Sequence, residues 1–283
     1  MPELRLRGGE VDGLALNYLV EGRGPAVVLV HGLGGFAESW RHNIGPLAAR
    51  ATVYAVDLPG FGRSGKPPAG YSLAFFARAL HGFLDAVGVT HASLVGHSLG
   101  AAVSVTYALT HPARVERLAL LASCMPGFGW RPGWRARVMT APALGEALAL
   151  CGCAPLYRAA IAKCFHAPAA DEVAFLVGWD YAVRTSSPAR AAWLATVRAL
   201  TADFGQRRAD YRRAIATLDL PVLFVHGRQD GAIPAAHCAE MADAFGRATV
   251  RWLDACGHFP HIEHAPVVNG WLAEFLVGRR APR

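Results

Sequence analysis

The residues best suited to chemistry in this chain of 283 residues occupy positions 96–100, which read Gly-His-Ser-Leu-Gly. In the G-x-S-x-G pattern a serine stands on a sharp turn between a strand and a helix, with its hydroxyl exposed. The flanking glycines allow the tight turn and let the helix approach the strand. The amides and the positive dipole end of that helix would stabilise an anion formed beside the serine. The pattern therefore predicts that Ser98 is a nucleophile.

A serine is a weak nucleophile at neutral pH, so a base and an orienting acid must complete such a site. Of the twelve histidines, His258 stands out because it lies just after the last predicted strand and before the last predicted helix. Asp230 also lies just past the end of a predicted strand. Ligands of α/β folds bind at the carboxyl edge of the sheet, and both residues are placed there. They are the candidate base and acid.

Other polar residues near these positions have simpler explanations. We interpret His31 as a turn residue that hydrogen-bonds the backbone, and His97 as a residue beside the nucleophile that packs there or supports the catalytic residues without acting in catalysis itself. His261 and His264 are expected inside or at the start of the last helix. Asp57 is explained by the chemistry of its Asp-x-Pro-Gly turn.

The elements that must position these residues alternate short apolar strands with longer helical patterns. Strands are predicted over Leu14–Val20, Ala26–Val30, Thr52–Val56, Ala92–Val95, Val115–Leu121, Pro221–Val225 and Thr249–Leu253. Helices are predicted over Ser39–Ala49 with Ser39 as its N-cap, Ser72–Val87, Ser98–Leu109, Pro234–Ala244 and Pro266–Leu276. The later strands lack polar alternation, which is typical of parallel strands buried on both faces. The sequence therefore predicts an α/β fold with a doubly wound sheet.

This pattern is interrupted over residues 125–213, where helical stretches punctuated by prolines contain no convincing strand. We therefore predict a core of residues 1–124 and 214–283, with 125–213 as a helical insertion. Some of its aromatic residues are expected to line an apolar pocket and most to pack between helices; they are Phe128, Trp130, Trp134, Tyr157, Phe165, Phe175, Trp179, Tyr181 and Trp193. Arg131, Arg135 and Arg137 are interpreted as solvated surface, with contact to a substrate carboxylate as the alternative.

Composition excludes several classes of protein. With 53% apolar and 17% charged residues the chain is not intrinsically disordered. Its net charge of +7 comes from thinly spread arginines, and no basic cluster is interleaved with aromatics, so no nucleic-acid partner is predicted. No apolar run approaches roughly 18 residues and the first residues form no apolar signal segment. We expect a cytoplasmic protein without a membrane span, and its oligomeric state is left open.

Six cysteines are too few for a disulfide scaffold. The group Cys151, Cys153, Cys164 and His166 lacks the paired spacing of a zinc knuckle, so buried free thiols are the better interpretation. Neither a metal nor a cofactor is predicted.

Four motifs together resemble the α/β-hydrolase family over nearly the whole chain. They are the His-Gly-Leu-Gly-Gly turn at 31–35, the Asp-Leu-Pro-Gly-Phe-Gly-Arg-Ser turn at 57–64, the turn at 96–100, and Gly257-His258. The resemblance implies a mostly parallel central sheet flanked by helices, with a helical cap inserted after the sixth core strand. It also implies Ser98 as nucleophile, Asp230 as orienting acid and His258 as base, in the chain order typical of this family. Some members carry the acid after the strand before the insertion, but residues 122–124 here contain no carboxylate.

The same resemblance implies a mechanism. The backbone N–H groups of Leu33 and Leu99 would form the oxyanion hole. Epoxide hydrolases and haloalkane dehalogenases of this family use a carboxylate nucleophile, so Ser98 disfavours both reactions. The remaining expectation is a serine hydrolase that cleaves a small to medium carboxylic ester with an apolar portion, through an acyl-enzyme and without a cofactor.

Three alternatives stay open. The same triad serves C–C bond hydrolases, and it serves acyltransferases or perhydrolases in which another nucleophile replaces water. A protein of another class, a non-catalytic receptor for a small ligand, can also keep an intact triad on this fold.

Overall fold

The central sheet of the protein has seven strands in the order β3-β5-β4-β6-β7-β8-β9. A computed structural model describes residues 4–68, 70–128, 138–150, 153–206 and 208–277. Its strands are β1 (Leu4–Arg5), β2 (Ala15–Leu16), β3 (Tyr18–Glu21), β4 (Ala26–Val30), β5 (Thr52–Val56), β6 (Ala92–His97), β7 (Val115–Leu121), β8 (Val222–Gly227) and β9 (Ala248–Leu253). The α-helices are α1 (Arg41–Ala48), α2 (Leu73–Ala86), α3 (Leu99–Thr110), α5 (Leu144–Leu150), α6 (Ala154–Ala162), α7 (Ala170–Arg184), α8 (Ser187–Gln206), α9 (Arg208–Ile215), α10 (Ala235–Ala242), α11 (Pro260–Glu263) and α12 (Ala265–Val277), and short 3₁₀ turns cover Gly9–Val11, Ala37–Trp40 and Pro112–Arg114.

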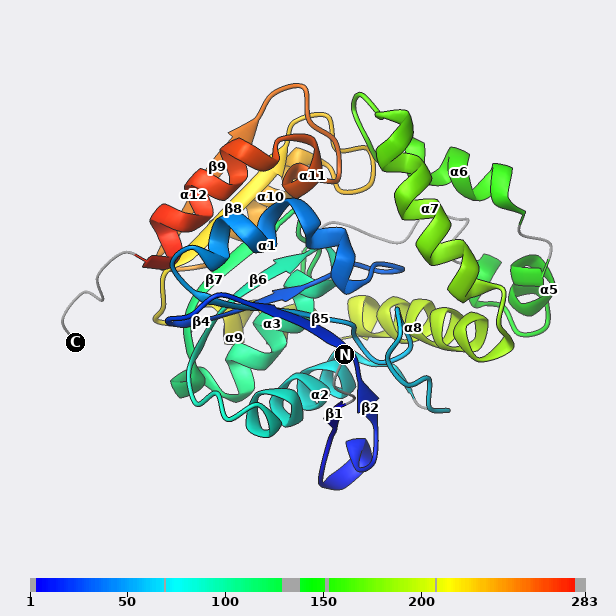
Figure 1. The fold of residues 1–283 in the computed structure, drawn as a ribbon, viewed down its shortest axis with the longest axis horizontal. Helices are drawn as coiled ribbons and strands as arrows, with labels where there is room; N and C mark the ends of the chain where they lie inside the picture. Colours follow the sequence, from blue (N-terminus) through cyan, green and yellow to red (C-terminus); the bar gives the residue numbers. More distant parts are fainter. Residues whose placement is uncertain (1–3, 69, 129–137, 151–152, 207, 278–283) are drawn as a thin grey trace.

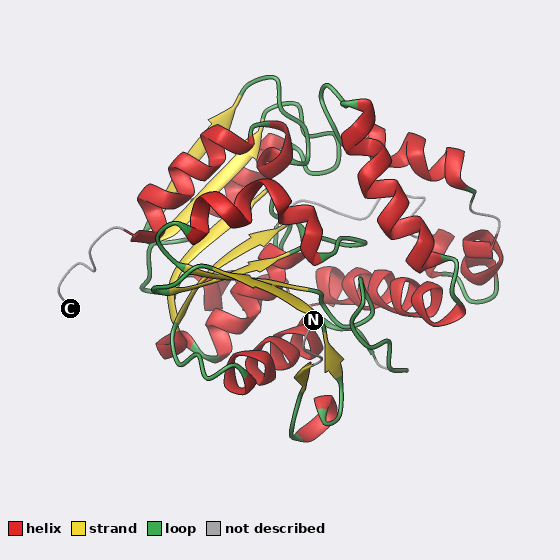
Figure 2. Ribbon diagram, in the orientation of Figure 1, coloured by secondary structure: helices red, strands yellow, loops and turns green. Residues whose placement is uncertain are grey.

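All strands of this sheet run parallel except β3, which pairs antiparallel with β5 at one edge. The predicted, mostly parallel sheet flanked by helices is confirmed (Figure 2). Because parallel strands end at the same edge, the turns after β4, β6, β8 and β9 are brought together there. These are the turns that carry Leu33, Ser98, Asp230 and His258.

The two faces of the sheet explain why its strands read as continuous apolar runs. Val27 and Leu29 of β4 pack in a cluster with α1 and α12, whereas Val28 and Val30 pack in a second cluster with α2 and α3. Successive side chains of a strand point to opposite faces, so both sets must be apolar. Figure 1 shows α1 and α12 lying together over one face of the sheet.

Helices α5 to α9 fill the chain between β7 and β8, and the described part of that stretch contains no strand. Figure 1 shows α5, α6, α7 and α8 gathered to one side of the sheet. This segment was expected after the sixth core strand, but β7 is the fifth strand of the central sheet in chain order. β1 and β2 pair only with each other and are not part of this sheet. Trp130, Trp134, Arg131, Arg135, Arg137 and Cys151 lie outside the described residues.

Two local predictions were wrong. Leu14–Val20 is not one strand but is divided at Asn17, whose side chain donates to Asp57 Oδ2 at 2.8 Å and whose N–H donates to Ser64 Oγ at 2.9 Å. Ser39 is not an N-cap, because it lies inside the 3₁₀ turn before α1 and its hydroxyl donates to Phe36 O. The side chain that accepts a backbone N–H at the start of this turn comes from a distant residue. Asp57 Oδ1 accepts the Ala37 N–H at 2.6 Å.

Within the described ranges, no single helix is long and apolar enough to cross a membrane. The pair α5 and α6 meets that criterion by length and composition only when both are taken together across a 100° bend.

Candidate active site

Ser98 stands at the junction of β6 and α3 in a conformation that few side chains adopt. Its φ is 52° and its ψ is −115°, and its N–H donates to Leu121 O at 2.9 Å. A Cβ on Gly96 would lie 2.4 Å from Gly100 O, and one on Gly100 would lie 2.1 Å from Val30 O. Both glycines are therefore required for α3 to approach β4 and β6 this closely, and the predicted strand–turn–helix setting of Ser98 is what the structure contains.

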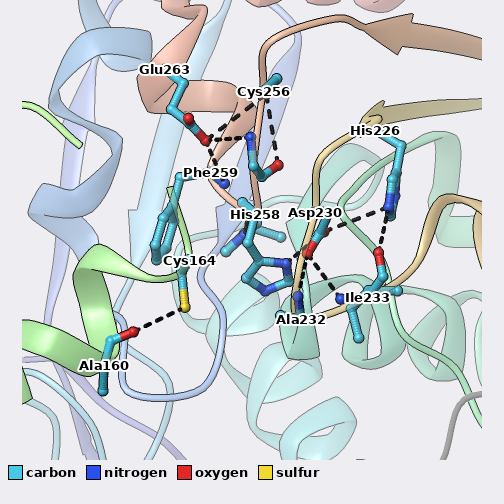
Figure 3. A network of polar contacts seen from close by, with 12 residues as sticks. Ala160, Cys164, His226, Asp230, Ala232, Ile233, Cys256, His258, Phe259 and Glu263 are labelled. Atoms are coloured by element: carbon cyan, nitrogen blue, oxygen red, sulfur yellow. Dashed lines mark hydrogen bonds and ion pairs between the residues drawn. The ribbon is translucent and has the colours of Figure 1, made fainter. Parts of the chain in front are cut away.

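His258 is paired with Asp230, as Figure 3 shows. The distance from His258 Nδ1 to Asp230 Oδ2 is 2.8 Å, and Asp230 Oδ1 accepts the N–H groups of Ala232 at 2.8 Å and Ile233 at 2.9 Å. Burial raises the pKa of Asp230, but His258 and the hydrogen bond from Ile233 outweigh it, so the pKa lies below its usual range. An ionised carboxylate only accepts, so Nδ1 carries the proton and Nε2 keeps its lone pair. This is the tautomer that a general base needs.

The backbone of His258 is held by residues from two other parts of the chain. Its N–H donates to Cys164 O at 2.6 Å, and its carbonyl oxygen accepts from His97 Nε2 at 2.7 Å. Burial lowers the pKa of His97 to about 3, with His258 adding to the effect, so His97 is neutral. His97 therefore has the supporting role that was one of the two expected from the sequence, because it holds the loop that carries His258.

The turn after β4 is fixed by His31. Its Nε2 accepts the Leu58 N–H at 2.9 Å, so Nδ1 is protonated and donates to Gly32 O at 2.7 Å. The structure therefore agrees with the interpretation of His31 as a turn residue that bonds the backbone. Leu33 follows in this turn, and Leu99 is the first residue of α3, where helix amides lack an intrahelical partner.

A cavity of about 270 Å³ brings most of the predicted residues together. Ser98, His258, Leu33 and Leu99 all line it, and Asp230 lies behind His258 with 6% of its surface exposed. The other lining residues are Gly32, Gly34, Gly35, Phe36, Ser39, His97, Cys124, Ile161, Cys164, Leu176, Asp180, Leu200, Phe204, Ala232, Ile233, Phe259 and His261. No hydrogen bond joins the Ser98 hydroxyl to the His258 ring in the described residues. Such bonds commonly tighten only when substrate is bound.

His261 also lines the cavity and lies in α11 rather than in the last long helix. Its ring packs against Trp40, with 4.3 Å between the ring centroids, and burial holds its pKa well below the usual range. His258 is the better candidate for the base than His261, because the carboxylate of Asp230 is hydrogen-bonded to His258.

The expectation that some of the predicted aromatics line the pocket was wrong for those the structure describes. The helical segment contributes Ile161, Cys164, Leu176, Asp180, Leu200 and Phe204 to the lining. The predicted aromatics instead pack between helices and against the core: Phe36 stacks on Trp179 with 5.4 Å between centroids, and Phe165 contacts Phe259 at 4.8 Å. Phe204, which was not among the predicted aromatics, is the aromatic residue that the described part of the helical segment contributes to the lining.

Two residues of the site were missed by sequence reasoning. His226 in β8 is fully buried, lies 3.5 Å from Asp230 Oδ2 and donates to Ile233 O at 2.8 Å, which fixes the loop behind the acid. Glu263 accepts the Gly257 N–H at 2.8 Å. The sequence shows only that a charged residue, Glu263, lies five positions after His258. That spacing alone does not predict its hydrogen bond to Gly257.

Among the described residues, no group of three or more His, Cys, Asp or Glu side chains is arranged to hold a metal ion.

Comparison with known proteins agrees with this geometry. The sequence model of the alpha/beta hydrolase fold matches residues 25–150 and 158–265. The chain belongs to the α/β-hydrolase family.

Relatives within the α/β-hydrolase family carry several activities in their names. A putative carbamate hydrolase of Variovorax paradoxus is 33% identical over 276 residues, which cover 95% of this chain and 98% of that protein. A 2-hydroxymuconate semialdehyde hydrolase of a Pseudomonas species is 29% identical over 281 residues, covering 93% and 91%. The solved structure of a 2-hydroxy-6-oxo-6-phenylhexa-2,4-dienoate hydrolase from a Rhodococcus strain has a TM-score of 0.81 at 27% identity and covers 97% of this chain and 98% of that one. These likenesses support a hydrolase.

The buried histidines of this α/β-hydrolase predict acid lability. Burial lowers the pKa values of His97, His31 and His226 in the folded protein, while the unfolded chain protonates each near its ordinary pKa. The unfolded state then binds more protons, so the free energy of unfolding should fall as pH drops from about 6.5 toward 3. Urea unfolding between pH 7.5 and 5 measures this slope.

The His97→Gln variant should lessen that slope by up to about one proton, because it removes one group that only the unfolded state protonates. The exposed His91→Gln change serves as the control. An identical slope in wild type and His97→Gln would contradict the assignment of a neutral, buried His97.

Proposed function

We propose that the protein is a serine hydrolase that cleaves a small to medium carboxylic ester through an acyl-enzyme. The observation that carries the proposal is that Ser98 and the Asp230-paired His258 open onto one largely apolar cavity. A cavity of about 270 Å³ suits a small ligand rather than a polymer.

In the first half-reaction, Ser98 Oγ attacks the ester carbonyl while His258 Nε2 takes its proton. Asp230 holds the tautomer and stabilises the imidazolium that forms. The N–H groups of Leu33 and Leu99 receive the oxyanion, and preorganised donors of this kind are worth roughly 10²–10³ in rate each. The proton then passes from His258 to the leaving alcohol as the C–O bond breaks.

In the second half-reaction, His258 deprotonates a water molecule that attacks the acyl group on Ser98. The tetrahedral intermediate uses the same two backbone donors, and its collapse returns the proton to Ser98 and releases the acid. The low-lying pKa of Asp230 keeps its carboxylate ionised throughout this cycle at neutral pH.

We further propose that residues 125–213 act as a cap on a core of residues 1–124 and 214–283. The supporting observation is that α6, α7 and α8 supply Ile161, Leu176 and Leu200 to the wall of the same cavity that Ser98 and His258 line. The cap would then select the acyl or alcohol portion.

A C–C bond hydrolase is the second candidate, because two of the relatives above are named as hydrolases of a 2-hydroxymuconate semialdehyde and of a 2-hydroxy-6-oxo-dienoate rather than of an ester. A dienoate substrate bears a carboxylate. The described lining residues include Asp180 and no Lys or Arg, so this part of the wall supplies no cation for such a group. The described part of the lining therefore favours an uncharged ester.

The test is a chain-length panel of p-nitrophenyl esters, with mass spectrometry of the acylated protein. We expect turnover, an acyl adduct on Ser98, and a kcat/KM for the best ester about 100-fold or more above that for 2-hydroxy-6-oxo-6-phenylhexa-2,4-dienoate.

Each alternative gives a different outcome. Faster dienoate cleavage would transfer the assignment to the C–C bond hydrolases. Acyl transfer to an added alcohol or peroxide faster than to water would indicate a transferase or perhydrolase. Phosphonate labelling of Ser98 without turnover of any substrate would indicate a receptor.

A further inference from the structure

A single carboxylate, that of Glu263, accepts hydrogen bonds from the residues on both sides of His258. Glu263, the last residue of α11, accepts the N–H of Gly257 at 2.8 Å and the N–H of Phe259 at 3.4 Å, both on Oε1 (Figure 3). These are the amides immediately before and after His258. A carboxylate oxygen has the lone pairs to receive both.

The other oxygen of the same carboxylate bonds the helical segment between β7 and β8. Glu263 Oε2 accepts the His166 N–H at 2.8 Å. His166 lies between α6 and α7, two residues after Cys164, whose carbonyl oxygen receives the N–H of His258 itself. The Glu263 side chain therefore joins loop 257–259 to segment 164–166. The backbone hydrogen bond from His258 N–H to Cys164 O joins the same two segments directly.

The packing at this junction leaves no space for a side chain on the loop. A Cβ on Gly257 would lie 2.4 Å from Cys164 O and 2.7 Å from His166 N. Phe165 is buried between these two residues and packs on Phe259. The backbone of segment 164–166 is thus seated directly on the backbone of loop 257–259, and Cys164 also lines the cavity.

We propose that Glu263 is a positioning residue that couples the seating of segment 164–166 to the placement of His258. The inference rests on the proposed function, in which His258 is the base and this segment belongs to the cap. When the segment is seated, all three amides from Gly257 to Phe259 have acceptors, and the loop that carries the Asp230-bonded imidazole is fixed. When the segment lifts, two hydrogen bonds break together: the one from His258 N–H to Cys164 O and the one from His166 N–H to Glu263 Oε2. Closing the cavity over substrate and aligning the base are then one event.

The test compares Glu263→Gln with Glu274→Gln, which changes an exposed glutamate on α12. A glutamine keeps the shape but has one acceptor oxygen, so it cannot bond Gly257 and His166 at once. We expect kcat for the best ester to fall on the order of 10- to 100-fold with little change in KM, because a small misplacement of a catalytic group costs rate rather than binding. Glu274→Gln should match wild type.

Hydrogen–deuterium exchange supplies the second readout. In Glu263→Gln the amides of residues 164–166 and 257–259 should lose protection together, since they are one cooperative unit. A wild-type kcat in Glu263→Gln, or loss of protection in only one of the two segments, would overturn the coupling.

If Glu263→Gln does not fold, Glu263→Asp replaces it. That side chain keeps the charge but is one methylene shorter, so it cannot span both segments and should show the same joint loss. The exchange measurement needs no substrate. A wild-type protein that hydrolyses no ester would refute the proposed function, while the joint protection of the two segments would still test the role of Glu263.

Discussion

Ser98→Ala is expected to lower kcat/KM for the best ester by roughly 10⁴-fold or more while leaving the protein folded. In the proposed mechanism the hydroxyl forms the bond to the acyl group, and no other residue in the described lining is placed to take over that step. Cys124 lies beside Ser98 in the cavity, but burial raises the pKa of its thiol to about 12, so it is protonated and unreactive. Initial rates and active-site labelling by a serine-reactive phosphonate measure the effect.

The matched control is Ser104→Ala, a buried serine on α3 whose hydroxyl donates to Gly100 O at 2.8 Å. It should keep most of the activity, and both variants should melt near the wild-type temperature. Near-full turnover by Ser98→Ala would rule out Ser98 as the nucleophile.

Gly100→Ala is expected to cost about 3 kcal/mol or more of the free energy of unfolding, because it overpacks a rigid contact. The new methyl group would lie 2.1 Å from Val30 O and 2.6 Å from His31 O. Both are backbone atoms in or next to a central strand, so neither can move aside as a flexible side chain could. The start of α3 would be pushed away from β4, and Leu99 would move with it. Chemical unfolding of the purified variant measures the loss.

Gly270→Ala is the control for this prediction. Gly270 is an exposed glycine of α12, and a Cβ there would meet nothing within 4 Å. Alanine should stabilise this helix by up to about 1 kcal/mol. Equal stability of Gly100→Ala and wild type would show that β4 and α3 can separate, contrary to the contact described above.

Ser98, Asp230 and His258 could be placed at one edge of the sheet from the sequence because each lies within a few residues of the end of a strand, and strands are local features. The ranges predicted for β4, β5 and β7 match the structure. Once the strands are predicted to pair in parallel, it follows that their carboxyl ends lie at the same edge of the sheet.

The predictions that failed depend on partners distant in sequence. Nothing near Ala37 reveals that Asp57 accepts its N–H, so Ser39 was the wrong choice of cap. The bonds from Glu263 to His166 and from His97 to His258 span 97 and 161 residues. Such contacts follow from how finished elements pack, and a sequence pattern of neighbouring residues does not contain them.

Helices α7 and α8 use different side chains to hold their place and to face the cavity. On α7, Phe175 and Trp179 lie under the guanidinium groups of Arg41 and Arg63, while Asp180 faces the cavity. On α8, Ala192 is buried in the main core, whereas Leu200 lines the cavity. Substitutions at Asp180 and Leu200 remove a contact to Tyr157 and some core packing, but they leave the contacts of Phe175, Trp179 and Ala192 whole. A lineage of such proteins can acquire a new substrate by a few mutations without crossing the stability threshold that limits most evolutionary change.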